Sequence, residues 1–199
     1  MQEELAGGPT ARRERIIVAA LSLIRGSAGA SVQMRDVAEQ AKVALATLYR
    51  YFPSRDELLA FAYERWREEC WEGLSASDPA EGETDADRFR RITHLDFRFL
   101  EREPHFCEIS TTLSRISTPT VVACMRRIRE RSYDIYLESF RTTEPADAMS
   151  VIEIFAAVME SQANQFVTGR ITAKAAYEAM DRCIYMLLIR SAADSSSSR

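Results

Sequence analysis

The segment from Val32 to Leu59 constrains the fold more than any other, because its apolar residues form two short helical stripes in close succession. The first stripe is spaced i, i+3, i+4, i+7, as on one buried helix face, and consists of Met34, Val37, Ala38 and Ala41. The second set consists of Val43, Leu48 and Phe52. The two sets meet at AKVA, which is too short for anything but a turn. The segment is therefore predicted to be a helix-turn-helix.

The polar residues of the same segment are of the kinds that contact nucleic acid. The side chains left outside the small core are Arg35, Lys42, Thr47, Tyr49, Arg50, Tyr51 and Arg55. Guanidinium, ammonium and hydroxyl groups donate hydrogen bonds to phosphate oxygens and base edges. The residues SRDE, from Ser54 to Glu57, then form a capping box that begins a third, longer helix. The segment is predicted to read DNA.

These residues resemble a known family. The run TLYRYFPSRDELL is similar to the recognition helix and following helix of the TetR family of one-component transcriptional regulators, and QMRDVAEQAKVA resembles the first helix and turn of the same motif. Within that family, the run QMRDVAEQAKVALATLYRYFPS is similar to repressors of sterol catabolism. The resemblance implies a helix-turn-helix DNA-binding head at 10–57, a helical effector-binding and dimerisation domain at 58–193, and flexible tails at 1–9 and 194–199.

The resemblance also implies how the head meets DNA. It places the helix from Ala44 to Phe52 in the major groove, with Arg35 donating to guanine or, alternatively, to a phosphate. Arg50 contacts a base or a phosphate, and the Tyr49 ring either faces DNA or packs under the motif. The predicted DNA-binding residues are Gln33, Arg35, Lys42, Leu45, Ala46, Thr47, Tyr49, Arg50, Tyr51 and Arg55.

Three positions depart from the family pattern. Lys42 stands where the turn usually carries glycine, and a side chain at positive φ costs about 1 kcal/mol. Ala44 stands where serine usually caps the recognition helix, and the loss of a cap costs about 1 kcal/mol. Gln33 stands where serine or threonine commonly caps the preceding helix. These departures affect the detail of the contacts but leave the motif recognisable.

The rest of the chain is predicted to be helical, with about nine helices in total. Seven Gly and six Pro among 199 residues favour long helices with few loops. The polar stretch SASDPAEGETDAD is the best candidate linker. The expected helices are Ala11–Arg25, a connecting helix from Leu58 to near Gly73, Asp85 to near Pro104, a short one around Phe106–Leu113, Pro119–Phe140, Pro145–Gly169 and one capped by Thr172. Arg and Lys number 8 against 7 Asp and Glu through Glu57 and 18 against 23 afterwards, so the acidic surplus lies outside the head.

The family resemblance further implies an apolar effector and a homodimer that places two heads on a palindromic operator, with half-sites roughly 34–36 Å apart. The candidate ligand residues are Phe89, Ile92, Thr93, Phe99, Phe106, Met125, Phe155, Met159, Gln162 and Phe166, although stripes of this kind are more often plain core. The last two helices are expected to form the dimer face through Ala156, Ala163, Ala176, Met180, Ile184 and Leu188, with internal packing as the alternative.

Other classes of protein find less support. Neither a GxSxG motif, a phosphate loop nor a metal-ligand spacing occurs, so no enzyme, no cofactor and no metal site is predicted. The four cysteines are scattered, which is typical of reduced side chains in helix cores. The chain has neither a secretory signal nor an apolar run of about 20 residues, so a cytoplasmic protein is expected. The remaining alternative is a helical protein-interaction module with a vestigial helix-turn-helix.

Overall fold

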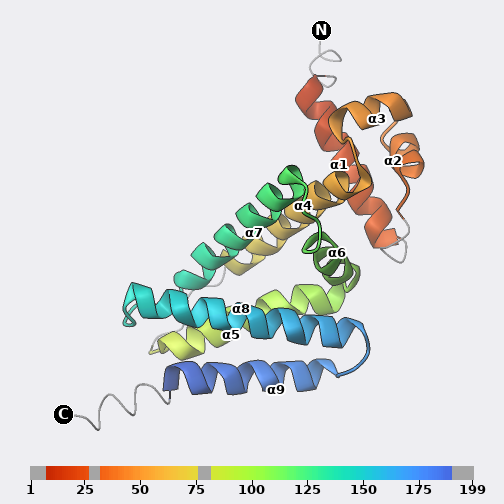
Figure 1. Ribbon diagram of the computed structural model, residues 1–199. Helices are drawn as coiled ribbons and strands as arrows, with labels where there is room; N and C mark the ends of the chain where they lie inside the picture. The colour runs from red at the N-terminus through yellow and green to blue at the C-terminus, as the bar shows by residue number, and fades with distance from the viewer. Residues whose placement is uncertain (1–7, 27–31, 76–81, 190–199) are drawn as a thin grey trace, which may run out of the picture. The chain divides into compact units, whose positions relative to one another are not determined.

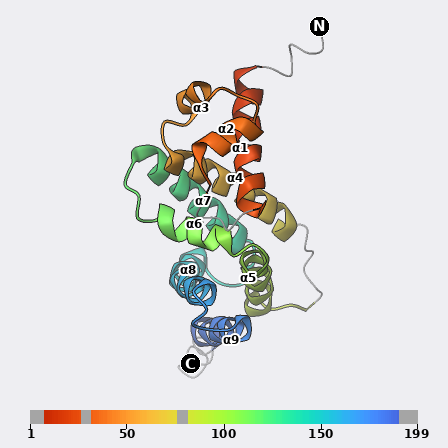
Figure 2. The ribbon, with the colours of Figure 1, turned by 90° about the vertical axis from the view of Figure 1, so that its right-hand side faces the viewer.

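The computed structural model describes residues 8–26, 32–75 and 82–189. Over these residues the regular secondary structure is helical, with nine α-helices and a π-helical segment. Figures 1 and 2 show the arrangement of the helices along the chain. The helices are α1 (Pro9–Gly26), α2 (Met34–Gln40), α3 (Leu45–Tyr51), α4 (Arg55–Ser75), α5 (Asp85–Arg102), α6 (His105–Leu113), α7 (Pro119–Leu137), α8 (Pro145–Val167) and α9 (Ala173–Ile184), followed by η3 (Tyr185–Ile189). The all-α fold class and the number of helices predicted from the sequence are confirmed.

The chain divides into two compact units. Unit 1 comprises residues 1–69 and 108–128, and unit 2 comprises residues 70–107 and 129–199. Unit 1 thus holds α1 to α3, most of α4 and parts of α6 and α7. Unit 2 holds α5, α8 and α9 together with the remaining turns of α4, α6 and α7. None of the described helices is long and apolar enough to cross a membrane.

Unit 1 is built on apolar side chains from its first four helices. Ile16, Val37, Leu48, Phe52 and Ala62 are each completely buried. The guanidinium of Arg13 lies 4.1 Å from the ring centre of Phe61, a cation–π contact between α1 and α4. The Cys124 thiol of α7 donates to the Ala60 carbonyl at 3.3 Å, and the Arg127 guanidinium binds both carboxylate oxygens of Glu64.

Unit 2 packs α5, α8 and α9 together, and α8 and α9 form an antiparallel hairpin (Figure 1). The turn between them uses Gly169 at φ 68°. There the N–H groups of Gly169 and Arg170 donate to the carbonyls of Phe166 and Gln165, which satisfies the end of α8. Thr172 caps α9 by accepting a hydrogen bond from Ala175 N at 3.2 Å, as predicted.

Several boundaries differ from the predicted ones. The predicted tails are outside the described residues except for residues 8 and 9, and Pro9 already begins α1, because proline is favoured at the first helical position. Thr10, just before the expected helix start at Ala11, is therefore inside the helix. The last three residues of the predicted linker begin α5, where Thr84 and Asp87 form a capping box. The helix ends at Gly26, one residue after the expected Arg25.

The stripe predicted for the dimer face is covered within the chain. Ala163, Ala176, Met180 and Ile184 are buried because α8, α9 and α5 pack on one another, and Ala156 and Leu188 are half-buried. The exposed large apolar side chains of α8 and η3 are instead Ile154, Tyr185 and Met186. The four buried residues of the stripe are therefore packed within the chain, and the dimer face itself stays a prediction.

Candidate functional site

The helix-turn-helix exposes the side chains predicted to bind DNA. Leu48 and Phe52 hold α3 in the core of unit 1 and are each 0% exposed, so the opposite side of this short helix faces outward. The exposed predicted residues are Gln33, Arg35, Lys42, Leu45, Ala46, Tyr49 and Arg50, and the half-buried ones are Thr47, Tyr51 and Arg55. All ten thus lie at the surface or partly exposed, and the backbone brings them onto α2, α3 and the residues that flank them.

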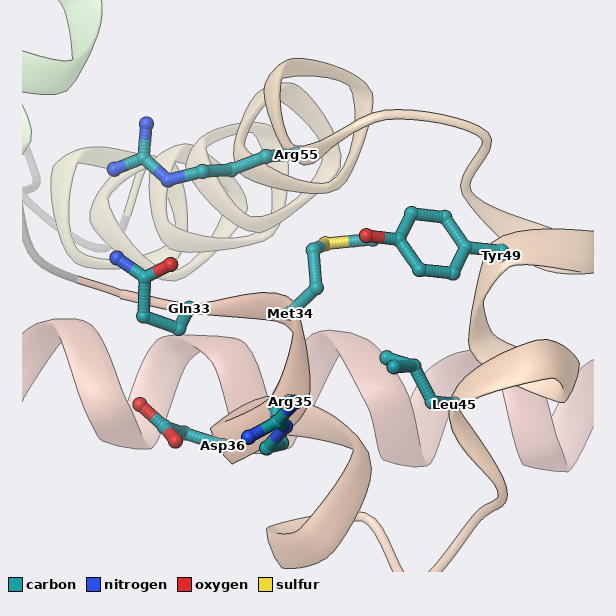
Figure 3. A pocket seen from close by; sticks show the side chains of 7 residues that line it. All are labelled: Gln33, Met34, Arg35, Asp36, Leu45, Tyr49 and Arg55. Carbon is teal, nitrogen blue, oxygen red and sulfur yellow. The ribbon is translucent and has the colours of Figure 1, made fainter.

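A recess of about 500 Å³ lies among these residues, lined by Gln33, Met34, Arg35, Asp36, Leu45, Tyr49 and Arg55. Figure 3 shows the Tyr49 ring reaching from α3 toward Met34, while Arg55 extends from the start of α4. Two arginines and the Gln33 amide supply donors, and Met34 and Leu45 supply apolar surface. Such a lining suits a sugar-phosphate strand, whose phosphates accept hydrogen bonds and whose sugars pack on apolar groups.

Arg55 also has a structural contact that the sequence did not indicate. Its Nε donates to the backbone carbonyl of Val32 at 2.8 Å, which joins the entry to α2 to the start of α4. Ser54 Oγ accepts from Glu57 N at 3.2 Å in the predicted capping position. The Arg55 guanidinium is therefore held at the rim of the recess, beside the N-terminus of α4.

The turn between α2 and α3 places Lys42 at positive φ, as predicted for a residue in the position where the family usually has glycine. Its φ is 53°, and among the described residues it is the non-glycine residue with positive φ. Its N–H donates to Glu39 O at 3.0 Å and the next N–H, of Val43, donates to Ala38 O at 2.9 Å, the pair of bonds that closes a helix through a left-handed residue. Ala44 makes no side-chain capping bond, so the predicted loss of that cap is confirmed, and Gln33 makes no capping bond either.

This turn yields a first prediction. Lys42→Gly should raise the free energy of unfolding by about 1 kcal/mol, because glycine adopts φ 53° without the steric penalty of a Cβ atom. Urea denaturation of both proteins measures the difference. Lys42→Ala is the matched control, since it removes the ammonium group but keeps the strained Cβ. An equal gain in stability for the alanine variant would contradict the conformational explanation.

The predicted effector residues lie in several environments. Phe89, Ile92, Thr93, Phe106, Phe155 and Met159 are buried, and Phe99, Met125, Gln162 and Phe166 are half-buried. Phe89 packs on Phe155 with ring centres 4.9 Å apart, so these two members of the set meet in unit 2. Met125 belongs to unit 1. Phe97, which was not among the predicted residues, packs its ring on those of Phe166 and Tyr177, with ring centres 5.7 Å and 5.1 Å apart.

A polar pair in the core of unit 2 escaped the sequence-based interpretation. Asp96 of α5 is 1% exposed, and its carboxylate accepts a hydrogen bond from the hydroxyl of Tyr136 on α7, which is 4% exposed. The same hydroxyl lies 3.5 Å from the sulfur of Met159 on α8. Asp96 is four residues after Ile92 and therefore falls on the predicted apolar face of its helix. A charged residue on an otherwise apolar helix face was the feature of the sequence that could have revealed this buried pair.

Comparison with known proteins agrees with this architecture. The model of the bacterial regulatory proteins of the tetR family matches residues 16–61, which span α2, α3 and most of α1. Over 178 residues the chain is 29% identical to the HTH-type transcriptional repressor KstR of Rhodococcus jostii, across 89% of this chain and 82% of that protein.

Solved structures share the fold along nearly the whole chain. A TetR transcriptional regulator from Rhodococcus sp. RHA1 superposes with a TM-score of 0.77 at 23% identity, covering 90% of this chain and 97% of the other. A transcriptional regulator from Saccharomonospora viridis, solved in complex with choline, gives a TM-score of 0.61 at 20% identity, covering 88% and 94%. The solved structures show a shared fold, and the family-model match together with the repressor relative confirms the predicted identity: the chain is a transcriptional regulator of the TetR family.

Proposed function

We propose that this protein is a repressor that binds a palindromic operator as a homodimer and leaves it when a small effector binds in unit 2. The observation that carries the proposal is the surface formed by α2, α3 and the start of α4, where two arginines, a glutamine and a tyrosine line one recess. The similarity to the KstR repressor supports repression rather than activation. The division into a head at 10–57 and an effector domain at 58–193 is part of this proposal.

The proposed DNA contacts follow from the chemistry of the exposed side chains. Arg35 and Arg50 can form paired hydrogen bonds with guanine in the major groove. Arg55, with Nε on the Val32 carbonyl, presents a guanidinium beside the N-terminus of α4, where a phosphate is favoured. Leu45 and Ala46 offer apolar surface to thymine methyl groups. In this arrangement the arginines of α2 and α3 supply sequence preference and Arg55 supplies affinity.

The effector and the dimer are proposed from unit 2. Its aromatic core, with Phe89, Phe97 and Phe155 buried, favours a ligand with apolar groups. A relative of this fold was solved with choline, which supports a small molecule as the effector. For the dimer we propose the apolar residues that remain exposed on α8 and η3, Ile154, Tyr185 and Met186, in place of the buried stripe. Because α4 contains residues of both units, a ligand-induced shift of this helix would couple effector to operator.

The test of this function is fluorescence anisotropy with labelled DNA from upstream of the chain's own gene, at two salt concentrations. Specific binding with an affinity that falls steeply as salt increases is the expected result, because phosphate contacts release counterions. A protein-interaction module with a vestigial helix-turn-helix would bind weakly or without sequence preference. Weak or non-specific binding would therefore contradict the proposed function, whichever ligand binds in unit 2.

Two substitutions separate base reading from phosphate binding. Arg35→Ala should weaken binding to the operator by about 1–3 kcal/mol and affect scrambled DNA much less, because a base contact discriminates between sequences. Arg55→Ala should weaken binding to both DNAs alike. Anisotropy titrations with both duplexes measure the two ratios, and urea denaturation accounts for the lost bond to Val32. Equal losses on cognate and scrambled DNA for both variants would contradict this assignment.

A further inference from the structure

The recess beside α2 and α3 has two unlike ends. Figure 3 shows Leu45 and Tyr49, both from α3, at one end, and Gln33 and Arg55 at the other. Leu45 and Tyr49 are four residues apart, so they lie on the same face of α3. Leu45 is 37% exposed and Tyr49 is 45% exposed. One end of the recess is therefore an apolar surface that is open to solvent.

A guanidinium group lines the same recess between these two ends. It belongs to Arg35, in the first turn of α2, and Figure 3 shows it on the α2 side of the recess. The preceding residue, Met34, also lines the recess and is buried, so it adds apolar surface beneath the exposed side chains. The recess thus places the paired N–H donors of one arginine beside the apolar surface of α3.

Two groups of the major groove match these two features. Guanine O6 and N7 accept paired hydrogen bonds from arginine, and the C5 methyl of thymine is the apolar group that a base pair presents in the groove. When a thymine lies directly on the 5′ side of a guanine, its methyl group projects beside the guanine edge. The planar guanidinium of an arginine bound to that guanine then packs against the methyl group. A step of this kind presents both groups to one recess.

We infer that the recess reads a two-base step, in which a pyrimidine with a C5 methyl group is followed on its 3′ side by guanine. The inference rests on the proposed operator binding and deepens it, because Arg35 and the α3 surface act together on one step. Arg35 donates to the guanine, while Leu45 and Tyr49 cover the methyl group. 5-Methylcytosine carries the same methyl group as thymine and therefore fits as well, whereas cytosine and uracil lack it.

The test compares four versions of one duplex, the DNA from upstream of the chain's own gene, in anisotropy titrations with the full-length protein. At each pyrimidine–guanine step in turn, the pyrimidine is thymine, uracil, 5-methylcytosine or cytosine. Thymine and uracil differ in the methyl group alone, and so do 5-methylcytosine and cytosine. Loss of the methyl group at the step that is read should weaken binding about fourfold in both comparisons, as expected for the burial of one apolar carbon.

The same exchanges in scrambled DNA are the control and should leave the affinity unchanged. The inference is wrong if no pyrimidine–guanine step shows a methyl effect of at least twofold. It is also wrong if the two comparisons disagree in sign, because the methyl group is what thymine and 5-methylcytosine share.

Variants assign the methyl effect to this recess. Leu45→Ala should reduce it to less than about twofold and leave the affinity for the uracil duplex unchanged, since the removed surface contacts the methyl group alone. Tyr49→Phe keeps the ring and should retain the effect. Val18→Ala removes apolar surface from α1, where Val18 is 51% exposed and lies outside the recess, and is the matched control with no expected change. An unchanged methyl effect in Leu45→Ala would overturn the assignment.

The outcome is separable from the function proposed above. Specific binding of the thymine duplex without a methyl effect at any step contradicts the two-base reading and leaves operator binding in place. Failure of the wild-type protein to prefer the thymine duplex over scrambled DNA contradicts the proposed function, and the inference with it. Far-ultraviolet circular dichroism checks the fold of each variant. If Leu45→Ala does not fold, the four duplexes with the wild-type protein still decide whether the methyl group is read.

Discussion

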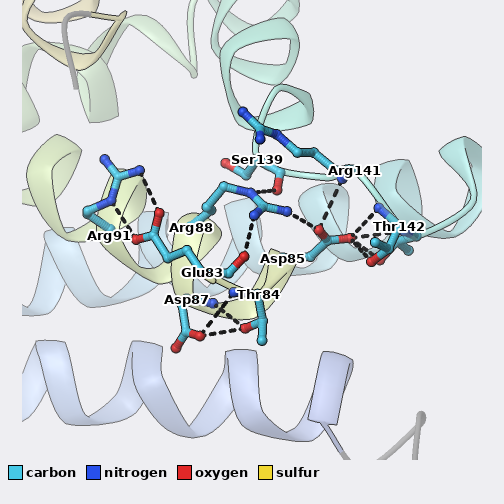
Figure 4. A network of polar contacts seen from close by, with 10 residues as sticks. Glu83, Thr84, Asp85, Asp87, Arg88, Arg91, Ser139, Arg141 and Thr142 are labelled. Atoms are coloured by element: carbon cyan, nitrogen blue, oxygen red, sulfur yellow. Dashed lines mark hydrogen bonds and ion pairs between the residues drawn. The ribbon is translucent and has the colours of Figure 1, made fainter. Parts of the chain in front are cut away.

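Asp85→Asn is expected to lower the free energy of unfolding by about 3–5 kcal/mol, the typical effect of breaking a buried ion pair from one side. Asp85 is 7% exposed at the start of α5, and it pairs with Arg88 one turn later (Figure 4). Its carboxylate also accepts hydrogen bonds from the segment that joins α7 to α8. These donors are Arg141 N, Thr142 N and Oγ1, and Thr143 N and Oγ1, at 2.8–3.0 Å.

Asparagine keeps the size of the side chain but cannot replace this pattern. Its amide has one acceptor oxygen, and its NH₂ group would face the N–H groups of Thr142 and Thr143. Arg88 would lose its charge partner while its Nε still donates to Ser139 O at 2.8 Å in a buried position. The substitution therefore leaves donors without acceptors at the junction of three helices, and such groups are expensive when buried.

The same carboxylate predicts a dependence of stability on pH. Burial alone would raise the pKa of Asp85. The hydrogen bonds from Arg141, Thr142 and Thr143 together lower it by more than burial raises it, so the pKa is well below its ordinary value. A carboxyl whose pKa is depressed by folding stabilises the protein above its unfolded pKa of about 3.9, and this contribution is lost as the pH falls below that value. Urea denaturation between pH 7 and pH 3 should show a loss of stability that is smaller in Asp85→Asn.

The matched control for this prediction is Asp87→Asn on the same helix. Asp87 is exposed and accepts from Thr84 N at 3.2 Å in the capping box, so its removal should cost about 1 kcal/mol. The pKa of Asp87 is also lowered, by its bonds to Thr84, and its contribution has the same sign with pH. Equal losses of stability at pH 7 for the two variants would show that the buried network contributes no more than an exposed cap.

The sequence allowed the helices and the DNA-facing surface to be predicted because both depend on local patterns. Positive φ at Lys42 followed from the place of one residue in a short turn, and the cap at Thr172 followed from residue type. The register of α7 was harder. Its buried face contains Val121 and Cys124, whereas the neighbouring Val122 is 50% exposed. A helix with four arginines offers few apolar residues to fix which of them face inward.

The residues that sequence reasoning missed are charged and buried. Asp85, Arg88 and Asp96 are each less than 9% exposed, although periodicity assigns charged residues to the solvent side of a helix. Asp85 and Arg88 pair with each other, but other partners of these residues are far away in sequence: Asp85 binds residues of 141–143, Arg88 binds Ser139 O, and Asp96 binds Tyr136. Such pairs become visible once the helices are packed. The position of Asp96 on an apolar stripe was the local signal, and its meaning depended on a partner 40 residues later.

The double variant Ile154→Asp/Met186→Asp is expected to lower operator affinity by about 10²–10⁴-fold, because a monomer loses the advantage of binding the second half-site from the same molecule. Ile154 is 52% exposed on α8 and Met186 is 61% exposed on η3, so both accept a charge without disturbing the core. In the proposed dimer, each aspartate would be buried unpaired at the contact. Analytical ultracentrifugation measures the mass of the assembly, and fluorescence anisotropy measures the affinity for the operator.

Val122→Asp, at an equally exposed apolar position of α7, is the control and should leave both the mass and the affinity unchanged. A dimer that persists in the double variant with full affinity would exclude these residues from the interface, because neither carboxylate could then lie in a contact that holds the two heads together.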